Sequence, residues 1–241
     1  MNERAPLPET LTSPPRGRVL ALVPHADDDV IGCGGTLAKH VAQGDEVTVV
    51  VVFDGRRGDP EELHDAEAYV ERRRQEARSA GAVLGLADYH FWDYPEGHEP
   101  SGPELASAAR RIADLMRSQR PDLVYAPWIG EHHLDHHVLA RGVRLALEAT
   151  SFAGEAWGFE VWTPLVATRI VDVTEVQDAK RKALELHRSQ IEAIPGFLDK
   201  ALSLQAQRAM YLAPESRFGE GFRPLGFVDE QDRDLLRLLS S

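Results

Sequence analysis

Apolar residues in this sequence form short continuous runs that alternate with longer stretches of helical spacing. The runs are rich in valine, and continuous apolar runs of this length are typical of strands buried on both faces of a sheet. We expect strands at about residues 18–23, 47–53, 89–92, 122–126, 159–162 and 168–171. Helical spacing predicts helices at about residues 36–43, 67–84, 103–120, the stretch up to 149, 175–191 and 197–212.

This alternation of strands and helices predicts an α/β fold with a mostly parallel sheet covered on both faces. We expect one Rossmann-like, three-layer domain over residues 17–241. Residues 1–16 are polar and contain several prolines, so we expect them to be disordered. The stretch at 218–239 is expected to mix loop and a short helix.

Composition narrows the class of protein. The chain has 241 residues, of which 43% are hydrophobic, which is enough for one large soluble domain. A net charge of −12 argues against a nucleic-acid partner or an anionic membrane surface. No apolar run is long enough for an integral membrane segment, and the N-terminus lacks the apolar core of a secretory signal. Composition does not exclude a homo-oligomer.

Cys33 is the single cysteine, so an intrachain disulfide is excluded and a cytoplasmic location is expected. Its thiol could be a ligand or a nucleophile. Nothing nearby in the sequence would lower its pKa, however, which favours a small residue packed in the tight turn expected at Gly32–Gly35.

The chemistry of the chain is concentrated where the first buried strand ends. The segment Pro24-His25-Ala26-Asp27-Asp28-Asp29 places one imidazole and three carboxylates there. Ligands of open α/β sheets bind at this carboxyl edge. Carboxylates crowded together raise one another's pKa unless a cation neutralises them, so the segment predicts a metal ion.

A second cluster, Glu131-His132-His133-Leu134-Asp135-His136-His137, follows another strand and opens a helix, so it should reach the same edge. Helical spacing puts His136 in line with the apolar inward face and His137 in line with the solvated face. Asp135 is expected either to cap this helix or to orient a catalytic imidazole. A solvated basic cap on the helix is the alternative for all four histidines.

His25, Asp28 and His136 would form a three-ligand site with one open position, which is typical of catalytic zinc. A metal at such a site can generate a nucleophile from water near neutral pH. Asp27 could then take the proton of that water, and His133, as imidazolium, could face the oxyanion that develops on a carbonyl. This set of groups describes the hydrolysis of an amide or an ester.

The same residues resemble a known family. Pro24–Asp29 followed by Gly32-Cys33-Gly34-Gly35-Thr36-Leu37 is similar to the HPDDE…GxGGT signature of the LmbE-like, PIG-L family of zinc-dependent de-N-acetylases. His133–His136 resembles its HxDH motif. Weaker similarities occur at Arg73–Glu76, Tyr94–Gly97, His187–Gln190 and Glu220–Phe222.

The resemblance implies zinc on His25, Asp28 and His136, Asp27 as a single general base and acid, and His133 as the stabiliser of the tetrahedral intermediate with Asp135 as its partner. It also implies that Arg73 and Glu96 contact a sugar. Ala26, Asp29 and Glu96 depart from the family pattern, and the change at Glu96 affects the expected substrate more than the expected chemistry.

We therefore expect a zinc-dependent hydrolase that removes an acetyl or another small acyl group from an N-acylated sugar or glycoside. Iron(II) or another divalent ion could replace zinc. Two histidines and one carboxylate are also the facial triad of non-haem iron oxygenases, so an oxygenase is a rival interpretation. The alternatives are a metallophosphoesterase acting on a sugar phosphate, and a sugar- or nucleotide-binding module without catalysis. Trp92 and Trp128 are candidates for stacking on a sugar ring, with burial in the core as the alternative.

Overall fold

The computed structural model describes residues 6–239, and its described strands form one sheet in the order β1-β7-β8-β6-β5-β2-β3-β4. All pairings are parallel except the two made by β8. This architecture is the expected α/β sandwich. The strands are β1 (Glu9–Leu11), β2 (Val19–Val23), β3 (Val47–Phe53), β4 (Asp88–Tyr94), β5 (Leu123–Pro127), β6 (Glu155–Phe159), β7 (Arg169–Asp172) and β8 (Gly219–Pro224).

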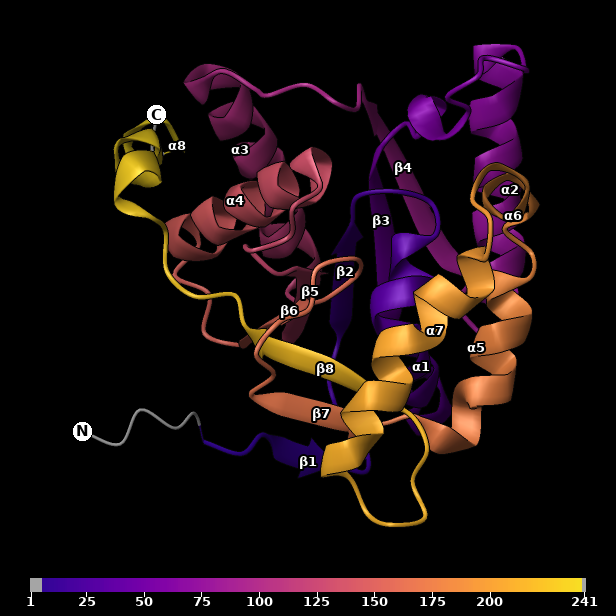
Figure 1. The fold of residues 1–241 in the computed structure, drawn as a ribbon. Helices are drawn as coiled ribbons and strands as arrows, with labels where there is room; N and C mark the ends of the chain where they lie inside the picture. Colours follow the sequence, from indigo (N-terminus) through magenta and orange to yellow (C-terminus); the bar gives the residue numbers. More distant parts are fainter. Residues whose placement is uncertain (1–5, 240–241) are drawn as a thin grey trace.

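Helices cover both faces of the sheet (Figure 1). Along β2, Val19, Ala21 and Val23 pack into one hydrophobic cluster, and Leu20 and Leu22 pack into the other. The first cluster includes side chains of α1, α2, α5 and α7, and the second includes side chains of α3, α4 and α8. The helices are α1 (Asp28–Gln43), α2 (Ala66–Val83), α3 (Gly102–Gln119), α4 (Leu134–Ala149), α5 (Gln177–Leu184), α6 (Arg188–Ala193), α7 (Phe197–Arg208) and α8 (Leu236–Leu239).

The connections after β2 and β5 create a crevice at the carboxyl edge of the sheet. These strands are parallel neighbours, with Val19 opposite Leu123 and Ala21 opposite Tyr125. The chain leaves β2 through α1 toward β3, and it leaves β5 through α4 toward β6 on the other side. Such a switch point is where α/β sheets bind ligands. Both chemical clusters of the sequence follow these two strands.

Strand β8 was missed by the sequence analysis, which expected a loop and a short helix over 218–239. The expected loop and short helix are present only after Pro224, where this strand ends. Its glycines and proline have low strand propensity, yet it pairs antiparallel with both β6 and β7. The buried pairing on both sides overrides local propensity.

The expected disorder of residues 1–16 was wrong for Glu9–Leu11, which form β1 beside β7. An ion pair between Arg169 and Glu9, with Nε and Oε2 3.1 Å apart, supports this pairing. A three-residue strand that depends on a partner 160 residues away leaves no local pattern to detect. Residues 1–5 of the same segment lie outside the described residues.

Helix α1 begins at Asp28, eight residues before the predicted start, and Gly32–Gly35 are helical rather than a turn. The glycines permit close packing that a side chain would block. A Cβ atom on Gly32 would lie 2.3 Å from the Phe159 ring, and one on Gly35 would lie 2.7 Å from Val173. Cys33 is buried within this helix, and burial raises the pKa of its thiol. The metal-ligating and nucleophilic roles for Cys33 are therefore not supported.

Two other predicted element boundaries differ from the structure, because carboxylate side chains accept hydrogen bonds from backbone N–H groups. The strand expected at 159–162 ends at Phe159, since the N–H groups of Val161 and Thr163 donate to the Glu131 carboxylate. The helix expected at 175–191 divides into α5 and α6, and the Ser189 N–H donates to Glu76. None of the helices in residues 6–239 has the length and apolar character needed to cross a bilayer.

Candidate metal centre and its pocket

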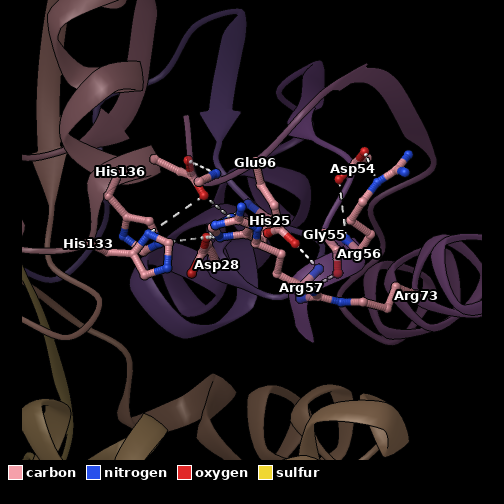
Figure 2. Close-up of polar contacts among 12 residues, drawn as sticks. His25, Asp28, Asp54, Gly55, Arg56, Arg57, Arg73, Glu96, His133 and His136 are labelled. Atoms are coloured by element: carbon pink, nitrogen blue, oxygen red, sulfur yellow. Dashed lines mark hydrogen bonds and ion pairs between the residues drawn. The ribbon is translucent and has the colours of Figure 1, made fainter. Parts of the chain in front are cut away.

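Three potential metal ligands converge at the switch point. His25 follows β2, Asp28 opens α1, and His136 lies in the first turn of α4. One donor atom from each of them lies within 4.8 Å of the others, and all three side chains are buried. The His25 Nδ1 and His136 Nε2 atoms lie 3.1 and 3.2 Å from the same oxygen, Asp28 Oδ2 (Figure 2).

The buried imidazole of His136 fits a metal ligand. Neither ring nitrogen makes a hydrogen bond of acceptable geometry within the described part of the chain, although the side chain is fully buried. Buried polar atoms normally have a partner, so a missing one indicates an absent ion or water. A divalent cation between His136, His25 and Asp28 would satisfy these nitrogens.

A second donor group, formed by His25, His133 and Asp135, shares His25 with the first. It fits a metal less well. The Asp135 oxygens are already engaged, because Oδ1 accepts the Gly97 N–H at 2.7 Å and Oδ2 lies 3.1 Å from His25 Nε2. The His133 side chain is 44% exposed. Because both groups use His25, they do not form two separate metal sites.

The charges of the donor group are mutually stabilised. Burial lowers the pKa of His25, but the carboxylates of Asp135, Asp28 and Glu96 outweigh this and raise it well above the usual range. Burial raises the pKa of Asp28, but His136 and His25 outweigh this and hold it well below the usual range. Three carboxylates, from Asp28, Glu96 and Asp135, and the two imidazoles of His25 and His136 thus occupy a buried region where a cation is favoured.

Asp27 borders the same cavity and pairs with Arg73. The Arg73 guanidinium donates to Asp27 Oδ1 at 3.1 Å and to the Gly55 carbonyl at 2.9 Å, and it is only 4% exposed. Arg73 was expected to contact a sugar. Its guanidinium is bonded to the Asp27 carboxylate, whose orientation it fixes, and Arg73 also lines the cavity.

His133 and Asp135 lie as neighbours, with His133 Nδ1 3.9 Å from Asp135 Oδ2. Asp135 does not cap α4, because the capping position is His133 and no side chain caps the helix. The alternative of a helix cap is therefore wrong. Burial, together with the nearby His136 and His25, lowers the pKa of His133, which favours a neutral imidazole over the expected imidazolium.

The other two histidines of the cluster point elsewhere. His137 is half-buried rather than solvated, and its Nδ1 lies 2.8 Å from the Ile129 carbonyl oxygen. His132 is exposed, and its backbone N–H donates to Thr163 Oγ1. Neither belongs to the two donor groups found among the described residues. The cluster is thus not a uniformly solvated cap.

A cavity of about 440 Å³ contains these groups. Arg57 and Gln190 also line it, and so do Trp162 and Ile194, which were not predicted from the sequence. They come from loops and a short helix that only the tertiary fold brings to this edge. The cavity is lined by His25, Asp27, Asp28, Arg57, Gly58, Arg73, Glu96, Gly97, His133, Leu134, Asp135, His136, Trp162, Gln190 and Ile194.

The predicted stacking residues Trp92 and Trp128 do not line this cavity. Trp92 lines a separate apolar cavity of about 220 Å³, and Trp128 donates its indole N–H to the Thr163 carbonyl. Trp162, whose indole is 39% exposed, lines the cavity instead. Its backbone N–H donates to Glu131, so a buried carboxylate fixes the loop that carries it.

Glu96 and the segment His187–Gln190 also lie near the donor group. Glu96 Oε2 lies 3.3 Å from His25 Nε2, and its other oxygen accepts the Arg57 N–H. Gln190 donates to the Tyr69 hydroxyl at 3.1 Å and reaches the cavity, whereas His187 is buried and does not line it. Burial lowers the pKa of His187.

The fold and the donor group define an α/β protein with a candidate metal site in a pocket at its switch point. Comparison with known proteins identifies the family. The chain matches the model of PIG-L, GlcNAc-PI de-N-acetylase, over residues 20–147. It is 30% identical over 195 residues to the diacetylchitobiose deacetylase of Thermococcus kodakarensis, and the alignment covers 72% of this chain and 70% of that protein. This chain therefore belongs to the PIG-L family of de-N-acetylases.

Two further relatives agree with this assignment. The chain is 32% identical over 168 residues to 1D-myo-inositol 2-acetamido-2-deoxy-alpha-D-glucopyranoside deacetylase 2 of Catenulispora acidiphila. That alignment covers 60% of this chain and 54% of the relative, so the chain spans about half of that protein's length. The solved N,N'-diacetylchitobiose deacetylase of Pyrococcus horikoshii has a TM-score of 0.71 and 25% identity, with 86% of this chain and 82% of that chain covered.

Proposed function

We propose that this protein is a metal-dependent hydrolase that removes the N-acetyl group from an N-acetylglucosaminide or a related amino-sugar glycoside. One observation carries the proposal. A single cavity gathers a buried three-donor group together with a carboxylate, Asp27, and an imidazole, His133, that the donor group does not need. Membership of a de-N-acetylase family supports the amide as the bond that is broken.

His25, Asp28 and His136 would hold the metal ion. Two nitrogens and one oxygen with an open fourth position suit zinc, and iron(II) also accepts this donor set. The bound ion supplies Lewis acidity, which lowers the pKa of water and polarises the amide carbonyl. Metal analysis of the purified protein tests the identity of the ion.

Asp27 acts first as the general base and then as the general acid. Its carboxylate takes one proton from the attacking water as the water oxygen bonds to the carbonyl carbon. When the C–N bond breaks, the same proton passes to the departing nitrogen, so that acetic acid and a free amine leave, and the acid then gives its remaining proton to solvent. Arg73 positions Asp27 by holding one oxygen, which leaves the other oxygen available for the proton.

His133 donates a hydrogen bond to the oxyanion of the tetrahedral intermediate. A neutral imidazole with one N–H is sufficient for this task, which agrees with its lowered pKa. The Asp135 carboxylate, 3.9 Å from His133 Nδ1, is too distant for a hydrogen bond and acts on the ring through its negative charge. Because Asp135 also accepts the Gly97 N–H, it ties the loop that carries Glu96 to the same centre.

The remaining walls of the cavity suit a sugar. Glu96 presents a carboxylate that can accept hydrogen bonds from sugar hydroxyls, and Trp162 offers an exposed ring face. The relatives from T. kodakarensis and C. acidiphila are named for N-acetylated glucosamine derivatives. We therefore favour an N-acetylglucosaminide, with its acetamido group at the metal centre and its ring against Trp162.

The test is amine release from a panel of N-acetylglucosaminides, before and after dialysis against a chelator. The proposal predicts release that the chelator abolishes and that added zinc or iron(II) restores. Phosphate release from sugar phosphates without amine release would favour the phosphoesterase alternative. Tight binding of the glycosides by the metal-loaded protein without turnover would favour a binding module.

A further inference from the structure

Arg57 presents an unpaired positive charge to the cavity. It lies in the 3₁₀ turn Arg56–Gly58 after β3, and its side chain is exposed and lines the cavity. Its backbone N–H donates to Glu96, so the turn itself is fixed. In Figure 2, His133 and His136 lie on one side of His25, and Arg57 and Arg73 lie on the other.

Gly97 makes room for the Arg57 guanidinium. A Cβ atom on Gly97 would lie 2.1 Å from Arg57 Nη1, and the backbone there has a positive φ of 69° that favours glycine. The guanidinium therefore rests on the backbone of the loop that also carries Glu96. A side chain at position 97 would require the guanidinium to shift from this place.

The neighbouring cations have counterions, whereas the Arg57 guanidinium has none among residues 6–239. Arg73 pairs with Asp27, and the Arg56 Nε donates to Asp54 Oδ2 at 2.6 Å. Among the cavity-lining residues that the structure describes, the Arg57 guanidinium is the cationic group with no carboxylate within 4.0 Å. A guanidinium offers planar, paired N–H donors that match a phosphate or a carboxylate.

We infer that Arg57 is a specificity-determining residue that recognises an anionic group, a phosphate or a carboxylate, on the part of the substrate beyond the N-acetylglucosamine ring. This inference rests on the proposed function. Arg57 and His133 lie on opposite sides of His25 (Figure 2), and Arg57 adjoins Glu96, which we place at the sugar ring, so we assign its contact to the aglycone. The contact stabilises the bound substrate and the transition state equally, so its loss should raise KM and leave kcat unchanged.

The experiment compares three glycosides of the same anomeric configuration: methyl N-acetylglucosaminide, carboxymethyl N-acetylglucosaminide and N-acetylglucosamine 1-phosphate. Amine release gives kcat and KM for the wild type, Arg57→Ala, Arg57→Lys and Arg56→Ala. Arg56→Ala is the matched control, because Arg56 is adjacent and exposed but engaged by Asp54. Circular dichroism checks that each variant is folded.

We expect the wild type to prefer at least one charged glycoside over the methyl glycoside by about tenfold in kcat/KM, the size of one charge-assisted contact. Arg57→Ala should reduce this ratio to about one by raising KM, Arg57→Lys should keep part of it, and Arg56→Ala should keep all of it. Added salt should weaken the preference. Which charged glycoside is preferred identifies phosphate or carboxylate as the recognised group.

Two results would overturn the inference while leaving the proposed function intact. The wild type could deacetylate all three glycosides equally, or the preference for charge could persist in Arg57→Ala. If the folded, metal-loaded wild type released no amine from any of the glycosides, the proposed function would fail, and the inference would fail with it.

Discussion

Asp27→Asn is the substitution that separates general-base catalysis from metal binding. Asparagine has the same shape as aspartate, and its side-chain oxygen can still accept the Arg73 guanidinium, which lies 3.1 Å from Asp27 Oδ1. It cannot take a proton from water. The donor group of His25, Asp28 and His136 is unchanged, so the metal should remain.

The expected loss follows from the role of a positioned base. General acid–base catalysis contributes about 10²–10⁴ in rate, and one group here serves both steps, so kcat should fall by about 10³ or more, equivalent to about 4 kcal/mol. The charge of buried Arg73 loses its counterion, so some loss of stability is also expected. The assay is steady-state amine release at a temperature where the variant is folded, with metal content measured on the same sample.

Asp54→Asn is the matched control for this experiment. Asp54 is also a buried aspartate bonded to an arginine, Arg56, but it does not line the cavity. Its substitution should leave kcat nearly unchanged. If Asp27→Asn retained kcat within tenfold of the wild type, or lost its metal, the assignment of Asp27 as base rather than ligand would be refuted.

Three further outcomes are expected. His133→Ala should lower kcat by about a hundredfold or more with metal retained, as for the loss of one oxyanion donor, and a change confined to KM would contradict this role. Burial raises the pKa of Asp29 from its usual 3.8 to about 7, so its contribution to stability is present below about pH 4 and is lost as pH rises toward 7. In metal-free protein, unfolding free energies of the wild type and Asp29→Asn should therefore diverge by about 1.4 kcal/mol per pH unit in that window, and parallel curves would exclude the shift. Trp162→Ala should raise KM several-fold, by about 1 kcal/mol of lost ring contact, whereas Trp92→Ala should not, and equal effects would remove Trp162 from the sugar site.

The sheet and the meeting of the two clusters were predictable because they depend on local patterns. Continuous apolar runs identify buried strands, and parallel strands bring their carboxyl ends to one edge. The same logic placed His25 and the 131–137 cluster together, since β2 and β5 are neighbours. Helical spacing distinguished the inward face of α4, where His136 is fully buried, from the side that carries half-buried His137.

Features that depend on distant partners could not be predicted. The glycine-rich sequence of β8 gives no local sign of its pairing with β6 and β7. The glycines of α1 suggested a turn, because their close packing against Phe159 and Val173 depends on the tertiary fold. Arg73 was expected to contact a sugar, but its pairing with the buried Asp27 carboxylate was not predicted. No local signal in the sequence connects it to a residue on another loop.

Asp135 illustrates the same limit at the level of one side chain. Its position at the start of a helix suggested a cap, which is a local role, yet its oxygens are taken by Gly97 and His25 from two other segments. Trp162 and Arg57 likewise reach the cavity through loops whose course depends on Glu131 and Glu96. The composition of the loop that carries Trp162 does not mark it as part of a site.

The metal content of His136→Ala, compared with that of His137→Ala, tests the account most directly. Both substitutions remove one imidazole from the first turn of the same helix, so they differ chiefly in the direction of the side chain. Measured by elemental analysis after purification, His137→Ala should carry as much divalent metal as the wild type and His136→Ala should carry almost none. Equal metal content in both variants, or loss in His137→Ala alone, would contradict the assigned centre.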